Sequence, residues 1–170
     1  TKALDGVNLA IDPGKVVGLL GHNGSGKTTM LKIIAGLRRP TTGRVEVFGM
    51  TPGVETKKRV AFLSEVNTYY DWMTVDGLLN FVKSFHPDLC LEKAAELKEF
   101  MKLKGAAKIG ALSKGQQARL KLVVGLSRQA DLMLLDEPLA GIDPPSRAKI
   151  LHALVGELRQ EGQTGIISTH

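Results

Sequence analysis

The hydrophobic positions of the chain follow more than one pattern. Some short runs are apolar at almost every position, which is typical of parallel strands buried on both faces. Buried strands are therefore predicted at residues 15–21, 60–64, 132–136 and 164–169. A looser alternation of apolar and polar positions predicts further strands at residues 1–11 and 44–48.

Other segments have apolar residues at the three- and four-residue spacing of amphipathic helices. They predict helices at residues 27–37, about 75–85, about 91–103, from 113 onward and about 144–160. Thr74 stands at an N-cap position, and Ser113 with Gln116 fits a capping box. Residues 66–129 contain no further strand pattern, so the sequence predicts a parallel α/β core that is interrupted by a helical insertion.

Composition and charge limit the class of protein. The chain has 170 residues and ordinary hydrophobic and charged fractions for a globular domain. No apolar run approaches the ~18 residues that span a bilayer, and no secretory segment opens the chain. The single cysteine, Cys90, is interpreted as a packing residue in a reducing compartment. We attribute the net charge of +6 to solubility and a basic phosphate site rather than to nucleic-acid binding.

An octamer at residues 21–28, GHNGSGKT, matches the phosphate-binding loop G-x-x-x-x-G-K-[ST]. It lies between a predicted buried strand and a predicted helix, so backbone N–H groups and the positive helix end point at one spot. Lys27 can reach the β- and γ-phosphates, and the Thr28 hydroxyl can coordinate Mg²⁺. The glycines without a Cβ that let the backbone approach the anion are Gly21, Gly24 and Gly26. The octamer therefore predicts a P-loop NTPase.

A second motif ends the apolar strand predicted at 132–136. The strand finishes at Asp136, and Glu137 follows directly. A buried parallel strand presents its last residue at the carboxyl edge of the sheet, where ligands of α/β proteins bind. Asp136 is therefore expected to hold Mg²⁺, directly or through water. The Glu137 side chain points elsewhere because side chains alternate along a strand, and it is the candidate base for the attacking water.

Residues 112–116 read LSKGQ at the start of a predicted helix. With the two motifs above, this sequence resembles the ATP-binding-cassette (ABC) family, whose signature is L-S-G-G-Q, and the resemblance covers essentially the whole chain. The resemblance implies an ATP-driven head-to-tail dimer. In that dimer, Ser113, Gly115 and Gln116 would contact ATP held by the other subunit.

The resemblance also implies a division into lobes and further site residues. A RecA-like core lobe would comprise residues 1–65 and 130–170, and a helical lobe residues 66–129. The implied ATP-binding residues of the loop are Gly21, His22, Asn23, Gly24, Ser25, Gly26, Lys27, Thr28 and Thr29. The implied magnesium ligands are Thr28, Asp136 and Glu65. The implied catalytic residues are Lys27, Glu137 and the switch histidine His170, and Asp143 would lie in the dimer interface.

Two positions depart from the family pattern. Lys114 replaces a signature glycine, and its side chain either adds charge near the phosphate or, as we favour, points to solvent. Glu65 stands where the family usually has a glutamine that links magnesium and water to the helical lobe, and it adds negative charge near ATP. Together with residues 71–75, Glu65 is more similar to the export-type branch, whose membrane subunits are separate chains.

The implied partners are a second ABC subunit and a separate transmembrane subunit. Tyr69, Tyr70 and Trp72 follow Glu65, either as ordinary packing or as an exposed aromatic patch that docks the membrane subunit. The chain would then act at the cytoplasmic face of the cell membrane. Nucleic acid is not an expected partner.

The sequence is thus identified as the ATP-binding and ATP-hydrolysing subunit of an ABC transporter. One alternative is a non-catalytic ATP-binding module in a heterodimer, which Glu65 and Lys114 keep open. Another is a soluble ABC ATPase, although no second cassette or coiled-coil insertion is visible in the sequence. The adenine-stacking aromatic residue usual in the family is absent from residues 1–3, and the chain stops at His170, so we expect a fragment of a longer protein.

Overall fold

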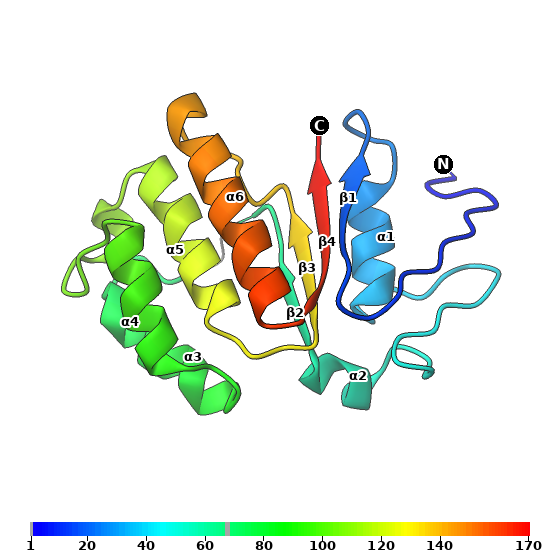
Figure 1. Cartoon of the computed structure of the whole chain (residues 1–170), viewed down its shortest axis with the longest axis horizontal. Coiled ribbons are helices and arrows are strands. Elements are labelled where there is room, and N and C mark those ends of the chain that lie inside the picture. Colours follow the sequence, from blue (N-terminus) through cyan, green and yellow to red (C-terminus); the bar gives the residue numbers. More distant parts are fainter. Residues whose placement is uncertain (1, 67–68) are drawn as a thin grey trace. The chain divides into compact units, whose positions relative to one another are not determined.

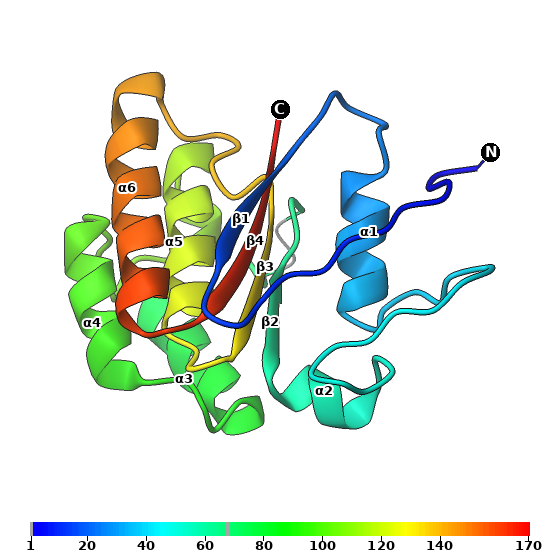
Figure 2. The ribbon, with the colours of Figure 1, turned by 45° about the vertical axis from the view of Figure 1, so that its right-hand side comes forward.

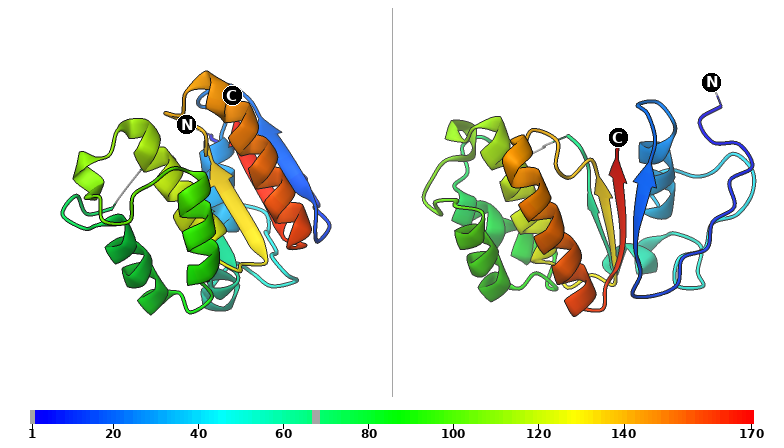
Figure 3. Two further views of the ribbon diagram at one scale, coloured as in Figure 1. Left: turned by 60° about the vertical axis from the view of Figure 1, so that its left-hand side comes forward. Right: turned by 45° about the horizontal axis from the view of Figure 1, so that its top comes forward.

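The computed structural model describes residues 2–66 and 69–170 (Figure 1). Its sheet contains β1 (Val16–Leu20), β2 (Val60–Leu63), β3 (Leu132–Asp136) and β4 (Thr164–Thr169). The strands are ordered β1-β4-β3-β2 and all pairs are parallel, so their carboxyl ends lie at one edge (Figure 3). Each of the four apolar runs predicted as a buried strand forms one of these strands, which confirms the predicted parallel α/β fold.

The elements fall into two compact units. The first comprises the described part of residues 1–63 with 130–137 and 158–170, and it contains the sheet, α1 (Lys27–Ile34) and α2 (Val54–Lys58). The second comprises the described part of residues 64–129 with 138–157. It contains α3 (Val75–Phe85), α4 (Leu91–Phe100), the 3-10 helix η1 (Ile109–Ala111), α5 (Lys114–Leu126) and most of α6 (Pro144–Gln160). The boundaries of the core and helical lobes stay a prediction, and residues 138–157 fall in the helical unit.

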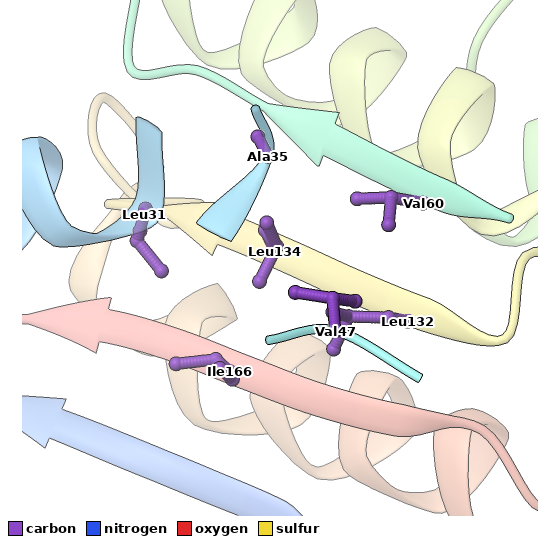
Figure 4. Packing of buried hydrophobic residues seen from close by; sticks show 7 residues of the cluster. All are labelled: Leu31, Ala35, Val47, Val60, Leu132, Leu134 and Ile166. Atoms are coloured by element: carbon purple, nitrogen blue, oxygen red, sulfur yellow. The ribbon is translucent and has the colours of Figure 1, made fainter. Parts of the chain in front are cut away.

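The core of the first unit lies between α1 and one face of the sheet (Figures 2 and 4). Leu31 of α1 and Leu134 of β3 have no exposed surface, and complete burial of such a side chain contributes about 1.5–3 kcal/mol. This packing fixes α1 on the sheet, and with it the loop that precedes α1. The cluster consists of Leu31, Ala35, Val47, Val60, Leu132, Leu134 and Ile166.

Two helices end earlier than their apolar periodicity predicts. Helix α1 ends at Ile34 rather than at 37, because Gly36 takes the left-handed conformation (φ 67°) and its N–H donates back to the Ile33 carbonyl. A left-handed residue just beyond the last turn is a common helix terminator. Helix α4 ends at Phe100 rather than near 103, and Lys102 takes the same conformation there (φ 55°).

The two strands predicted from looser alternation are wrong. Residues 2–11 form no strand, and Val7 and Leu9 are 53% and 54% exposed. Residues 44–48 contribute only an isolated antiparallel bridge between Val47 and Met50. A strand needs a neighbour for its backbone hydrogen bonds, and the described part of the chain pairs no strand with either segment. Helix α2, with 5 residues, is too short to give a periodic signal in the sequence.

Both predicted helix caps are confirmed. The Thr74 hydroxyl accepts the Gly77 N–H at 3.0 Å before α3. At the start of α5, Ser113 Oγ accepts the Gln116 N–H at 3.2 Å, and Gln116 Oε1 accepts the Ser113 N–H at 2.9 Å. This reciprocal pair satisfies donors that a helix start leaves unpaired, so residues 112–116 are held as the beginning of a helix. None of the helices within the described residues combines the length and apolar character required to cross a membrane.

Candidate nucleotide-binding site

The loop between β1 and α1 has a backbone that requires glycine. Gly24 and Gly26 have φ angles of 84° and 93°, in the left-handed region that other residues rarely adopt. A Cβ on Gly26 would collide with the carbonyl oxygen of Ala3. A Cβ on Gly21 would lie 2.7 Å from Ser25 Oγ. The loop is therefore tightly wound, as the phosphate-binding motif predicts.

The other predicted ATP-binding residues of the first unit lie in this loop or in the helix that follows it. His22, Asn23 and Ser25 are exposed, and Thr28 and Thr29 are half-buried in the first turn of α1. The first backbone N–H groups of a helix have no partner within the helix, and the helix dipole makes this end positive. A phosphate group would therefore find unpaired donors and a favourable potential at this position.

Lys27 connects the loop to the carboxyl end of β3. The side chain is 8% exposed, and its Nζ donates to the carbonyl oxygens of Gly21 at 2.5 Å and His22 at 3.2 Å. The same Nζ lies 3.7 Å from Oε1 of Glu137, whose side chain is 12% exposed. Water and salt screen partly buried charges weakly, so this attraction is stronger than that of a surface pair.

Strand β3 delivers two carboxylates in different environments. Asp136 is 1% exposed, and Glu137 follows it in the left-handed conformation with φ 46°. That conformation costs a residue with a Cβ roughly 1–2 kcal/mol, and such strain is concentrated at functional sites. Oε1 of Glu137 is buried and accepts no hydrogen bond from the described residues. A water molecule or ligand that donates to this oxygen would satisfy it.

Strand β4 supplies partners for both carboxylates. Its register places Ser168 beside Asp136, where Ser168 Oγ donates to Asp136 Oδ1 at 2.8 Å and accepts the Glu137 N–H at 2.9 Å. Directly after β4, Nδ1 of His170 lies 3.0 Å from Glu137 Oε2, and the His170 side chain is 63% exposed. The first unit therefore brings Lys27 and His170 to the Glu137 carboxylate. It also links Asp136 and Glu137 through Ser168, a residue that the sequence interpretation missed.

The end of β3 fits a magnesium ion that arrives with a nucleotide. Mg²⁺ prefers oxygen ligands and is commonly held by one or two carboxylates together with substrate phosphates. Asp136 and Thr28 offer such oxygens within the first unit, whereas Glu65 is exposed and belongs to the second unit. Within the described ranges, no group of three His, Cys, Asp or Glu side chains could hold a metal ion. Phosphate oxygens and water molecules would supply the remaining ligands.

In the second unit, the start of α5 lies against the loop that precedes α6. A Cβ on Gly115 would lie 3.2 Å from the carbonyl oxygen of Gly141, which itself has a φ of 82°. Glycine at residue 115 therefore permits a close approach between the signature segment and this loop. Lys114 is exposed to solvent, and whether it adds charge near a phosphate of another subunit stays a prediction.

Glu65 is tied to α5 through its backbone rather than its side chain. Lys121 is 5% exposed, and its Nζ donates to the carbonyl oxygens of Ser64 at 3.0 Å and Glu65 at 3.3 Å. A buried ammonium group requires such acceptors, so these bonds hold the chain around Glu65 against α5. The sequence interpretation missed Lys121, although a lysine among the apolar residues of this helix was a usable signal.

Asp143 organises the start of α6 within the second unit. Its Oδ2 accepts the Ser146 N–H at 3.0 Å, and its Oδ1 accepts from Arg119 Nη2 at 3.0 Å. Hydrogen bonds from the side chain and backbone of Ser146, together with the Arg119 charge, hold the pKa of Asp143 below its ordinary value. Arg119 was not identified from the sequence, because nothing in it places α5 beside this loop. The role of Asp143 at a dimer interface stays a prediction.

Asp143→Asn is expected to lower the melting temperature at neutral pH. The amide oxygen can still accept the Ser146 N–H, but the charge that attracts Arg119 is lost. A carboxyl with a lowered folded-state pKa stabilises the fold above its ordinary pKa of 3.8, and this contribution disappears as the pH falls through the folded-state value. Thermal unfolding of both proteins from neutral to acidic pH measures the difference. If the difference in melting temperature does not narrow as the pH falls below 3.8, this account is contradicted.

The aromatic residues after Glu65 do not behave alike. Tyr70 and Trp72 are 58% and 70% exposed, and their rings stack with centroids 5.8 Å apart. Tyr69 differs, because burial raises the pKa of its phenol to about 12. Tyr69 is therefore packed against the protein, whereas Tyr70 and Trp72 are exposed.

Comparison with known proteins gives the family. The sequence profile described as ABC transporter matches residues 4–140. This chain belongs to the ABC transporter family. An uncharacterized ABC transporter ATP-binding protein of Methanocaldococcus jannaschii is 36% identical to it over 179 residues, which cover 99% of this chain and 63% of that protein. The ABC transporter ATP-binding protein YtrB of Bacillus subtilis is 32% identical over 182 residues, with 100% of this chain and 61% of YtrB covered. The ABC chain thus spans about three fifths of these relatives.

Solved structures give the same family and fold. The ATP-binding cassette MJ0796, in a dimeric post-hydrolysis state bound to ADP and Pi, matches with a TM-score of 0.87 and 26% identity. That match covers 99% of this ABC chain and 80% of the solved chain. A nucleotide-free ATP-binding cassette from an ABC transporter matches with a TM-score of 0.75 and 27% identity, covering 99% and 75%. The predicted P-loop NTPase fold and the predicted family are therefore confirmed.

Proposed function

We propose that this chain binds ATP with Mg²⁺ and hydrolyses it, as the ATP-binding subunit of an ABC transporter. The observation that carries the proposal is the pair of contacts made by Glu137. Its Oε1 lies 3.7 Å from Nζ of Lys27, and its Oε2 lies 3.0 Å from Nδ1 of His170. An ammonium group of the phosphate-binding loop, a carboxylate and an imidazole thus converge, and phosphoryl transfer depends on such positioned charges.

Each of these residues has a role that its chemistry permits. The N–H groups of the loop and the Lys27 ammonium would bind the β- and γ-phosphates. Thr28 and Asp136 would hold Mg²⁺, which neutralises phosphate charge when it is bound. Glu137 would accept a proton from the attacking water. His170 would hold the Glu137 carboxylate and donate to the γ-phosphate.

A composite site formed by two subunits completes the proposal. Ser113, Gly115 and Gln116 form a capped helix start in the second unit, and a helix start favours a bound anion. In a head-to-tail dimer they would contact the γ-phosphate held by the other subunit, with Asp143 in the interface. The dimeric state of the cassette MJ0796, which matches this chain in fold, supports such a dimer.

The proposed partner of the dimer is a separate transmembrane subunit, which would place the chain at the cytoplasmic face of the membrane. Closure of the dimer on ATP and its opening after hydrolysis would switch the transmembrane subunit between two conformational states. The exposed pair Tyr70 and Trp72 is the proposed contact, because solvent-exposed aromatic residues are enriched in protein interfaces. The Nod factor export ATP-binding protein I of Burkholderia pseudomallei, 34% identical over 175 residues that cover 98% of this chain and 57% of that protein, supports the export-type branch.

The first test is the rate of Mg-dependent ATP hydrolysis measured against protein concentration. A site shared by two chains gives a rate that rises faster than linearly, because the active dimer forms by mass action. The Glu137→Gln protein serves as the blank for contaminating ATPases. A rate that stays at this blank while ATP still binds would reject hydrolysis by this chain.

ATP binding without hydrolysis would favour the alternative of a non-catalytic ATP-binding module. Two residues of the chain are consistent with that alternative. Glu65 adds a carboxylate where the family usually has an amide, and Lys114 replaces a signature glycine. Mixing the protein with a catalytically competent ABC subunit would then be the decisive assay. Stimulation of the partner's hydrolysis supports the regulatory role.

A further inference from the structure

We propose that Ser168 is a positioning residue that aligns the metal-binding carboxylate of Asp136 with the water-activating carboxylate of Glu137. The inference rests on the proposed ATP hydrolysis at this site and adds a residue that no motif of the sequence marks. It concerns residues of the first unit only.

The register of the sheet brings Ser168 to this position. β3 and β4 are parallel neighbours, and their pairing sets Ser168 opposite Asp136, the last residue of β3. Ser168 has no exposed surface, and Asp136 is 1% exposed. Their side chains therefore meet inside the protein, where each polar atom needs a partner.

The Ser168 hydroxyl serves two groups at once. It accepts the Glu137 N–H at 2.9 Å and donates its own hydrogen to Asp136 Oδ1 at 2.8 Å. A hydroxyl has one hydrogen to donate, so engagement with the Glu137 N–H directs that hydrogen to Asp136. The bond fixes the rotation of the Asp136 carboxyl and leaves Oδ2 outside this contact, as an oxygen that can face a metal ion or its water.

The same hydroxyl holds Glu137 in an unfavourable backbone conformation. Glu137 has a φ of 46°, which turns its side chain away from the direction that strand geometry would give. A hydrogen bond on its N–H stabilises this turn. Glu137 is therefore held at its backbone by Ser168 and at its side chain by His170, which lies 3.0 Å from Oε2.

One segment of the chain makes both contacts with Glu137. Ser168 lies in β4, whose last residue is Thr169, and His170 follows directly, with its Nδ1 3.0 Å from Glu137 Oε2. Loss of the Ser168 hydroxyl would leave a buried carboxylate oxygen and a buried N–H without this partner. The expected consequence is a looser arrangement of the metal ligand and of the base, rather than loss of the phosphate-binding loop.

The test compares Ser168→Ala, which removes the hydroxyl, with Ser168→Thr, which keeps it. Ser127→Ala is the matched control, because Ser127 is equally buried and its hydroxyl donates to the Val123 carbonyl at 2.6 Å, outside the first unit. The readouts are the affinity for ADP with Mg²⁺ and with EDTA, the Mg²⁺ concentration at half-maximal hydrolysis, kcat, KM and the melting temperature.

Mg²⁺ is expected to increase the affinity for ADP about tenfold less in Ser168→Ala than in the unchanged protein. The Mg²⁺ concentration that gives half-maximal hydrolysis should rise by about the same factor. The affinity of Ser168→Ala in EDTA should stay within about twofold, because the loop and Lys27 are unchanged, and kcat should fall while KM for Mg-ATP changes little. Ser168→Thr should restore the Mg²⁺ dependence. Ser127→Ala should change only the melting temperature.

Distinct outcomes separate this inference from the proposed function. If the unchanged protein hydrolyses ATP and Ser168→Ala has the same Mg²⁺ dependence, the inference fails and the function stands. If Ser168→Ala does not fold, Ser168→Cys takes its place, since a thiol is a weaker donor of similar shape. An unchanged Mg²⁺ dependence in that variant also overturns the inference. An unchanged protein without ATP binding removes the proposed function and this inference with it.

Discussion

Lys27→Ala is expected to weaken ATP binding by about a hundredfold or more, because it removes charge-assisted hydrogen bonds to the phosphates. A second effect acts in the same direction. The Lys27 ammonium lies 3.7 Å from the nearly buried Oε1 of Glu137, so its loss leaves a carboxylate without its counter-charge next to the position proposed for the γ-phosphate. The negative charge of Glu137 would then repel the triphosphate.

Calorimetry with ATP and Mg²⁺ measures the loss, and Lys32→Ala is the matched control. Lys32 lies on the same helix and carries the same charge, but its side chain is exposed in the last turn of α1. The control separates the specific effect of the loop lysine from the general effect of lowering the net charge. A folded Lys27→Ala protein whose ATP affinity lies within about threefold of the unchanged protein would remove the phosphate-loop assignment.

Local sequence patterns predict those helices and strands whose residues are all in the same surroundings, such as a strand that is buried along its whole length. The strand 132–136 is apolar at every position before Asp136, and it lies in the interior of the sheet with both neighbours present. The segments 1–11 and 44–48 have a looser alternation of apolar and polar residues, and they form no strand in the described residues. Alternation reports which side chains could share one face, but only the fold decides whether a neighbouring strand exists.

The same distinction applies to the candidate site. The octamer at 21–28 is local, so the winding of its glycines and the position of Lys27 follow from adjacent residues. The contact of Ser168 with Asp136 depends instead on which strands are neighbours and on their register. An isolated serine two residues before a histidine gives no sign of that. Arg119 is similar, because its bond to Asp143 joins segments 24 residues apart.

Glu137→Gln is expected to reduce kcat for ATP hydrolysis by about 10²–10⁴-fold, the range typical of general-base removal, while ATP affinity is kept or raised. The amide has nearly the same shape as the carboxylate, but it cannot accept a proton from water. It also removes a negative charge that lies 3.7 Å from Lys27 Nζ, so the ammonium becomes more available to the phosphates. Binding and turnover should therefore separate in this protein.

The separation should also be visible in the assembly state. If hydrolysis reopens a dimer closed on ATP, the Glu137→Gln protein should accumulate as an ATP-bound dimer in size-exclusion chromatography with light scattering, whereas ADP should leave it monomeric. Glu96→Gln is the matched control, since Glu96 lies exposed on α4 and the exchange has the same charge effect. Survival of turnover in Glu137→Gln would exclude Glu137 as the base. Loss of turnover without an ATP-dependent dimer would keep Glu137 as the base and reject the shared site. The two conclusions are separable because Glu137 lies in the first unit, whereas the signature segment proposed to form the shared site lies in the second.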